Sequence, residues 1–251
     1  MNFLVLSGWG FSPDIMLPFL KALEGLLNNS SQDAHIKLVK HNKYGMNLKS
    51  TAEQLLKHVD DDTILIGWSL GGLIARAATY YFSEHHARKI KACIILCSSP
   101  CFIAKDNWPG VDRKYFDGFY AKICDSGIDD LKKEFSYLCA MGGPSPKQWI
   151  RSISPYFLSS AQYYEQNKRG LAILSTDFRL EAKNITIPSL DIYADNDQLV
   201  PQYDLLGCDL SNLLSSNSKI INNSGHLLPL THTDECIDLM KNFLVLNNFF
   251  K

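Results

Sequence analysis

The sequence has almost no excess charge of either sign, no C-x-x-C cysteine pair and no apolar run of membrane-spanning length. The formal net charge of −1 gives no overall argument for a nucleic acid or an anionic membrane as partner, and we expect neither. The seven cysteines, an odd number without zinc-ligand spacing, disfavour a metal site and a disulfide framework. Reduced thiols and the lack of a basic signal-like stretch near Met1 predict a cytoplasmic protein.

Strand-like and helix-like segments alternate along most of the 251 residues. Short apolar or alternating runs predict strands at residues 3–6, 36–40, 63–67, 92–97, 189–193 and 218–222. Helical periodicity predicts helices after the Ser12-Pro13-Asp14 start signal, at 48–59, 71–82 and 202–214, and near 235–247. Such alternation indicates an α/β fold with a mostly parallel sheet covered on both faces. Functional groups then gather at the carboxyl ends of the strands.

The alternation stops between Ser98 and about Thr176. Short helical patterns there are interrupted by prolines and glycines, and no clear strand occurs. We therefore predict a helical lid insertion at residues 99–176. The α/β core would consist of residues 1–98 and 177–251.

The segment Gly67-Trp68-Ser69-Leu70-Gly71 matches the G-x-S-x-G pattern of a nucleophile elbow. Its setting carries the argument, because a buried strand precedes it and a helix rich in small residues follows it. In such a turn, side chains at the two glycine positions would collide with neighbouring backbone. The serine hydroxyl is then exposed at the carboxyl end of the sheet. We predict that Ser69 is the nucleophile of a serine esterase with an α/β-hydrolase fold.

A serine hydroxyl needs a base and an acid, which follow in the order Ser, Asp or Glu, His in this fold. His226 follows the last predicted strand and precedes the last helix, so it is the candidate base; His232 fits less well because it begins that helix. The acid is expected after the strand at 189–193. Asp197 is favoured and Asp195 is the alternative. Asp191 lies inside the strand and is not expected to reach the histidine.

Stabilising an oxyanion takes two backbone donors. The first is expected to be the amide of Leu70, the residue after the nucleophile. The second is expected from the loop Ser7-Gly8-Trp9-Gly10 after the first strand, and we assign it to the Trp9 amide. The Trp9 indole could line the pocket or simply pack in the core, and the sequence alone leaves both interpretations open.

Several pieces of the chain resemble the pimeloyl-[acyl-carrier protein] methyl ester esterases of biotin synthesis. The matching runs extend through almost the whole sequence and are 7–10, 67–73, 98–102, 106–110, 170–174 and 199–201. The resemblance implies a cofactor-free cytoplasmic esterase, monomeric, whose partner is an acyl-carrier protein bearing a methyl-esterified dicarboxylic acyl chain. It also implies a triad of Ser69, Asp197 and His226.

The resemblance implies further binding residues. Substrate contacts would come from Trp9, Ser69, Leu70 and His226, and from the lid segment Phe135, Ser136, Tyr137, Leu138 and Cys139. Lys147 and Arg151, four residues apart on one helix face, would bind the acidic carrier.

The chain also departs from that family. Ser7 stands where a histidine is usual, and two other basic lid positions carry Asp130 and Glu134. Two alternative functions therefore stay open. One is a broad short-chain carboxylesterase or another relative on the same scaffold. The other is a non-catalytic binding protein that has kept the fold.

Overall fold

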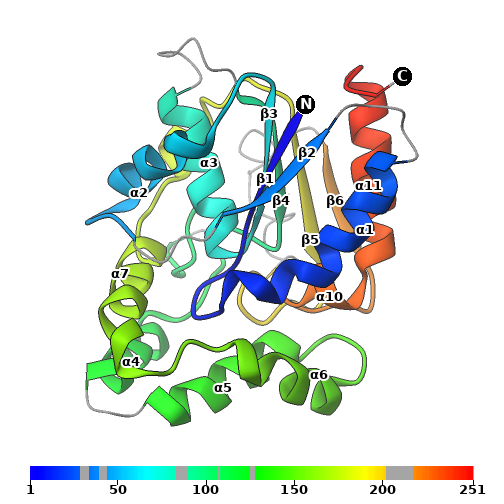
Figure 1. The fold of residues 1–251 in the computed structure, drawn as a ribbon. Helices are drawn as coiled ribbons and strands as arrows, with labels where there is room; N and C mark the ends of the chain where they lie inside the picture. The colour runs from blue at the N-terminus through cyan, green and yellow to red at the C-terminus, as the bar shows by residue number, and fades with distance from the viewer. Residues whose placement is uncertain are drawn as a thin grey trace.

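A parallel six-stranded sheet forms the centre of the protein, in a computed structural model that describes residues 1–28, 34–39, 44–82, 90–106, 108–124, 128–201 and 217–250. The strand order is β2-β1-β3-β4-β5-β6, with every neighbouring pair parallel (Figure 1). The strands are β1 (Asn2–Leu6), β2 (His35–Leu38), β3 (Thr63–Trp68), β4 (Ile90–Leu96), β5 (Ser189–Ala194) and β6 (Ser218–Ile221).

The central strands are apolar because both faces of the sheet are covered. All six residues of β3 are buried, and β4 is buried except for Lys91. The two strands at the ends of this sheet order are more exposed: β2 alternates between exposed and half-buried residues, and β6 carries exposed Lys219 and Ile220. Continuous apolar runs at the centre and mixed runs at the edges are the expected pattern for a parallel sheet between helices.

Helices pack on both faces of the sheet (Figure 1). One face carries α2 (Leu48–Leu55), α3 (Leu70–Phe82) and the short α8 (Arg179–Ala182), and the other carries α1 (Leu17–Asn28), α10 (Leu228–Thr231) and α11 (Thr233–Leu246). Helix α3 follows directly from β3, and its buried small residues, among them Ala75, Ala77 and Ala78, let it lie close to the sheet.

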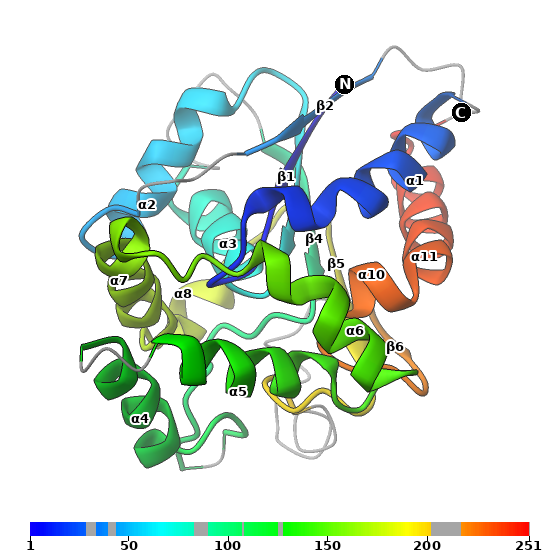
Figure 2. The ribbon, with the colours of Figure 1, turned by 60° about the horizontal axis from the view of Figure 1, so that its bottom comes forward.

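Besides α8, the described chain between β4 and β5 forms the helices α4 (Arg113–Cys124), α5 (Ile128–Ala140), α6 (Pro146–Ile153) and α7 (Tyr164–Leu174). Figures 1 and 2 show α4, α5 and α6 below the carboxyl ends of the strands, with α7 rising beside α2 and α3. The predicted lid thus corresponds to a helical layer over the functional edge of the sheet. The division at residues 99 and 176 stays a prediction.

The elements expected from the sequence agree with the structure. The six strands occur with small shifts at their ends, and the helix predicted at 48–59 is α2 followed by a 3-10 turn, Leu56–His58. The start signal at Ser12 is real, since its hydroxyl accepts a hydrogen bond from the Asp14 amide before a 3-10 turn, Pro13–Met16, leads into α1. The helix predicted at 202–214 lies outside the described residues.

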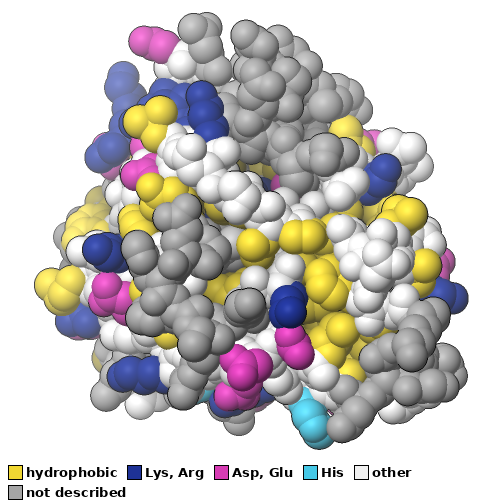
Figure 3. Space-filling model, turned by 90° about the horizontal axis from the view of Figure 1, so that it is seen from above, with side chains coloured by type: hydrophobic (Ala, Val, Ile, Leu, Met, Phe, Trp, Pro, Cys, Tyr) yellow, Lys and Arg dark blue, Asp and Glu magenta, His cyan; other side chains and the backbone are white. Residues whose placement is uncertain are grey.

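The end of the molecule opposite the lid shows no single dominant charge among the described side chains (Figure 3). Basic and acidic side chains lie near one another there, and hydrophobic side chains lie between them (Figure 3). Lys91 and Asp62, which flank the amino ends of β4 and β3, form an ion pair of 2.9 Å. Within the described ranges, no helix combines the length and the apolar character needed to cross a membrane.

Candidate active site

Ser69 occupies the turn between β3 and α3 in a left-handed conformation, with φ at 55°. L-residues other than glycine rarely adopt this conformation, and it is typical of strained functional turns. The two glycines make the turn possible. A Cβ on Gly67 would collide with the Gly71 backbone, and one on Gly71 would lie 2.6 Å from the carbonyl oxygens of Leu6 and Ser7. The Ser69 amide donates to Leu96 O at 2.9 Å, which ties the turn to β4.

His226 lies on the loop after β6, at the same end of the sheet as Ser69. Its Nε2 is 2.9 Å from Ser69 Oγ, and its Nδ1 is 2.8 Å from Asp197 Oδ2. The three residues are buried, with Ser69 4% exposed, Asp197 5% and His226 0%. The structure therefore brings together the three side chains predicted as nucleophile, base and acid, in one continuous hydrogen-bonded chain.

Two aspartates follow β5, and the structure separates their positions. Asp197 Oδ1 accepts the amides of Leu199 at 2.8 Å and Val200 at 3.0 Å, which leaves Oδ2 to face the imidazole. Asp195 instead accepts the amides of Asn223 and Ser224, both at 3.0 Å, and so holds the loop that leads to His226. Asp197 is thus the partner of the histidine, while Asp195 braces the histidine loop.

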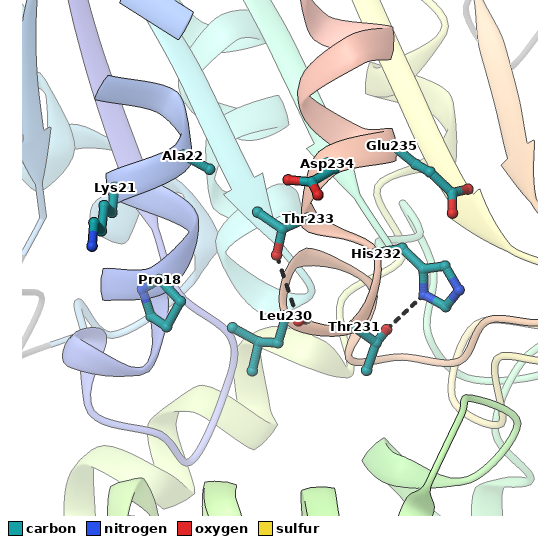
Figure 4. Close-up of a pocket in the computed structure, with 9 residues that line it drawn as sticks. All are labelled: Pro18, Lys21, Ala22, Leu230, Thr231, His232, Thr233, Asp234 and Glu235. Atoms are coloured by element: carbon teal, nitrogen blue, oxygen red, sulfur yellow. Dashed lines mark hydrogen bonds between the residues drawn. The ribbon is translucent and has the colours of Figure 1, made fainter. Parts of the chain in front are cut away.

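The other two acid and base candidates lie elsewhere. Asp191 is fully buried within β5 and forms an ion pair with Arg76 of α3. His232 lines a hollow of about 620 Å³ between α1 and the α10–α11 junction (Figure 4). Its Nδ1 lies 2.8 Å from Thr231 Oγ1, and the side chains drawn around it are not those predicted to bind substrate.

The two predicted oxyanion donors belong to Leu70, next to Ser69 in the chain, and to Trp9, which lines the same cavity as Ser69. Leu70 is the first residue of α3, so its amide has no acceptor earlier in that helix. Trp9 follows β1, and its indole is 1% exposed. Its Nε1 donates to Asn167 O at 2.9 Å, and its ring meets Phe135 edge to face at 4.8 Å. Trp9 also lines the same cavity as Ser69, so the indole both packs in the core and borders the pocket.

An apolar cavity reaches Ser69 from beneath the lid. Its lining comes from the core and from α4, α5 and α7, and consists of Trp9, Ser69, Phe102, Val111, Phe116, Phe119, Phe135, Leu171, Leu174 and Leu199. Apart from the serine, the lining side chains among the described residues are hydrophobic. The space left free inside is about 30 Å³, so the described side chains of the core and the lid nearly fill it.

The predicted lid segment on α5 presents two different faces. Phe135 lines the cavity, and Ser136 and Cys139 are buried on the same side of the helix. Leu138 is half-buried, and Tyr137 is 51% exposed on the outer face. The expected substrate contacts of this segment stay predictions, and Phe135 is the member that borders the cavity among the described residues.

Two buried thiols, those of Cys97 and Cys139, lie near the Asp197 carboxylate, and of these only Cys139 was expected at the site. Cys97, at the end of β4, has its Sγ within 4.8 Å of ligand atoms of Asp197 and His226. Burial raises the pKa of the Cys97 and Cys139 thiols well above the ordinary value, and the nearby charge of Asp197 raises both further. The Asp197 and His226 atoms of this cluster are engaged in the hydrogen-bonded chain to Ser69.

Lys147 and Arg151 lie on α6, and both are exposed. The acidic residues at the other two family positions are each paired with lysine: Asp130 with Lys133 at 3.4 Å, and Glu134 with Lys122. Tyr115 Oη also donates to Glu134 Oε1, at 2.7 Å. The two carboxylates are therefore partly neutralised, and Lys147 and Arg151 stay predicted carrier contacts.

Curated relatives agree with the resemblance seen in the sequence. A pimeloyl-[acyl-carrier protein] methyl ester esterase of Hamiltonella defensa is 27% identical over 257 residues, covering 97% of this chain and 92% of that protein. A protein of the same name from Vibrio vulnificus is 28% identical over 229 residues, covering 88% and 84%. The resemblance is thereby confirmed.

Solved structures show the same architecture. A bromoperoxidase from Bacillus anthracis superimposes with a TM-score of 0.79 at 17% identity, covering 97% of this chain and 91% of that one. An esterase from Exiguobacterium antarcticum gives 0.74 at 16% identity, covering 98% and 92%. At such identities the likeness concerns the fold, and it confirms the predicted fold class. Residues 29–233 match the family described as alpha/beta hydrolase fold, and because this match spans well over half of the chain, the protein belongs to that family.

Proposed function

We propose that this protein is a serine esterase that hydrolyses the methyl ester of pimeloyl-acyl-carrier protein, releasing methanol and the free carboxylate, in biotin synthesis. The observation that carries the proposal is the buried chain of hydrogen bonds from Ser69 through His226 to Asp197 at the end of an apolar cavity. The names of the curated relatives supply the substrate.

The first half-reaction forms an acyl-enzyme. Ser69 Oγ attacks the ester carbonyl while His226 Nε2, 2.9 Å away, takes the hydroxyl proton. Asp197 holds the imidazole in the required tautomer and stabilises its cationic form. The amides of Trp9 and Leu70 donate to the tetrahedral oxyanion. His226 then protonates the departing methoxide, and methanol leaves.

The second half-reaction releases the acid. A water molecule replaces methanol, and His226 removes one of its protons as it attacks the acyl carbonyl. The second tetrahedral intermediate is held by the same two amides. His226 returns the proton to Ser69 Oγ, and the carboxylate product is free. No cofactor is needed at any step of this proposal.

The cavity suits a methylene chain, because its lining is apolar apart from Ser69. The carrier would remain outside, against the exposed Lys147 and Arg151 of α6, where basic side chains attract an acidic partner. A free volume of about 30 Å³ is far too small for the acyl chain, so the lid helices must separate when substrate enters. We further propose that the protein acts as a monomer in the cytoplasm, where it would meet the carrier.

The central test is Ser69→Ala with methyl pimeloyl-acyl-carrier protein as substrate. Loss of the nucleophile is expected to lower kcat at least about a thousandfold. Ser175→Ala is the matched control, because that hydroxyl donates to Ala172 O on the surface and should keep the wild-type rate. A Ser69→Ala protein with the wild-type rate would exclude the mechanism. Failure of a fluorophosphonate probe to label Ser69 would favour the non-catalytic alternative.

A broad short-chain carboxylesterase is the second candidate, favoured because the described residues that line the cavity are apolar apart from Ser69. Charge reversal at Lys147 and Arg151 distinguishes the two. The biotin-synthesis function predicts a raised KM for the carrier-linked ester and an unchanged KM for a short p-nitrophenyl ester. The broad enzyme would be favoured by two results together. Charge reversal would change KM for both substrates equally, and the protein would not restore growth without biotin to a host that lacks its own such esterase.

A further inference from the structure

The chain directly after Trp9 is joined to the lid insertion by backbone contacts at Gly10, Phe11 and Ser12. Gly10 O accepts the Leu158 amide at 2.8 Å, and the Ser12 amide donates to Tyr156 O at 2.7 Å. Phe11 forms an antiparallel bridge with Phe157 between these two bonds. The loop from β1 therefore forms a short ladder with a segment about 150 residues further along the chain, and its position depends on that segment.

Asn167 of α7 lies at the centre of this junction. Its side chain is buried, and its Nδ2 donates to Leu158 O at 2.8 Å. Its backbone carbonyl accepts the Trp9 indole Nε1 at 2.9 Å. One residue thus holds both sides of the loop: the indole directly, and the backbone at Gly10 through Leu158.

The Trp9 indole packs against the backbone at Gly170, one turn later in α7. A Cβ at this position would collide with the Trp9 ring, lying 2.9 Å from Nε1, and would lie 3.0 Å from the Tyr44 ring. The indole and the α7 backbone are therefore in direct contact, without a side chain between them. Because Trp9 cannot shift toward α7, the geometry of α7 determines where the loop lies.

We propose that Asn167 is a positioning residue that fixes the Trp9 amide for transition-state stabilisation. This inference rests on the proposed esterase function, in which that amide is an oxyanion donor. Such a donor acts only when it lies at hydrogen-bond distance from the oxygen of the tetrahedral intermediate. A small displacement of the loop therefore raises the free energy of the transition state more than it raises that of the bound neutral ester.

The test is Asn167→Asp, which keeps the shape of the side chain but replaces the amide donor to Leu158 O by a carboxylate. Removing one oxyanion donor outright costs about a hundredfold to a thousandfold in kcat. Displacing it is expected to lower kcat about tenfold, with KM for a short p-nitrophenyl ester unchanged. Each rate is divided by the concentration of active sites, which is titrated with a fluorophosphonate. Unfolded protein then does not enter the comparison.

Asn184→Asp is the matched control. Asn184 Nδ2 also donates to a backbone carbonyl, that of Leu180 at 3.1 Å, but on the exposed surface. Its kcat should equal that of the wild type. A trifluoromethyl ketone, which forms an anionic tetrahedral adduct with the serine, should bind Asn167→Asp more weakly by the same factor as the loss in kcat. A purely structural role for Asn167 would lower thermal stability and leave kcat per titrated site and inhibitor affinity unchanged, and that result overturns the proposal.

A second variant covers the case in which Asn167→Asp does not fold. Gly170→Ala favours the helix by propensity but pushes a methyl group against the indole. It should lower kcat per titrated site, because the indole and the loop that carries it must move away from α7. Gly170→Ala with the wild-type kcat overturns the proposal. The esterase function itself is tested separately by Ser69→Ala, whose inactivity does not depend on either outcome.

Discussion

The indole Nε1 of Trp68 donates a 2.8 Å hydrogen bond to the backbone carbonyl of His226. Both residues are fully buried, and their rings lie 5.6 Å apart between centroids. The residue before the nucleophile therefore holds the loop that carries the proposed base. Strand β3 and the loop after β6 are far apart in the chain, and this bond joins the two halves of the site.

Trp68→Phe should remove this bond and leave the His226 carbonyl buried without its donor. We expect a loss of about 1–2 kcal/mol in the free energy of unfolding, together with a lower kcat as the imidazole shifts. Urea unfolding and ester hydrolysis measure the two effects. Trp108→Phe is the control, because its indole donates at 2.7 Å to Cys101 O instead. Equal kcat in both variants would contradict a role for Trp68 in placing the base.

Replacing each of the two aspartates after β5 by asparagine should lower kcat by very different factors. Asp197→Asn keeps the shape but presents the wrong hydrogen-bonding partner to His226 Nδ1, so kcat should fall about a thousandfold or more. Asp195→Asn should lower stability, because the carboxylate accepts two amides of the histidine loop, and should change kcat less than about tenfold. Steady-state kinetics beside urea unfolding tests both. The reverse order of kcat effects would transfer the role of the acid to Asp195.

Removing one partner of the buried Arg76–Asp191 ion pair should lower the free energy of unfolding strongly, whereas replacing both by apolar residues should lower it much less. Both side chains are nearly inaccessible, and Arg76 Nε is among the buried polar atoms without a hydrogen-bond partner in the described part of the chain. Arg76→Met should cost about 3–5 kcal/mol because it leaves a buried carboxylate without its cation. Arg76→Met with Asp191→Leu should recover much of that loss. Urea unfolding of the single and double variants measures the coupling, and equal losses in both would contradict it.

Asp177 should make stability depend on pH in the acid range. Hydrogen bonds from Arg179, at 2.8 and 2.7 Å, lower the pKa of the Asp177 carboxyl well below its ordinary value, and Lys105 lies 3.2 Å away. A carboxyl with a lowered pKa in the folded state stabilises the protein above its unfolded pKa of about 4, and this contribution disappears as the pH falls further. Asp177→Asn should therefore cost about 1 kcal/mol at pH 7. The difference from the wild type should shrink below pH 4 in urea unfolding, and a constant difference would contradict the assignment.

The elbow could be predicted from the sequence because its requirements are local. Gly67 and Gly71 are needed by the turn itself, and the adjoining apolar run and small-residue helix mark its setting. His226 was found by order along the chain, because parallel strands bring every following loop to one edge of the sheet. For the acid, the sequence favoured Asp197 and left Asp195 as the alternative. In the structure the amides of Leu199 and Val200 bind Asp197 Oδ1 and leave Oδ2 to face the imidazole.

Contacts between distant segments had no local signal. Asn167 is an ordinary polar residue in a helix until α7 is placed beside the Trp9 loop. Cys97, the residue after β4, is equally ordinary until its Sγ is placed near Asp197 and His226. For the same reason, the sequence left open whether the Trp9 indole packs in the core or lines the pocket. In the structure the indole does both.

The sequence by itself determined the fold class, the nucleophile turn and the order of the proposed triad, because strand and helix periodicity and glycine requirements act over a few neighbouring residues. The tertiary structure decided which aspartate meets His226, how the lid lies over Ser69 and what holds Trp9. Those outcomes depend on hydrogen bonds and close contacts between residues 29 to 158 positions apart, and chain neighbours do not constrain such distances.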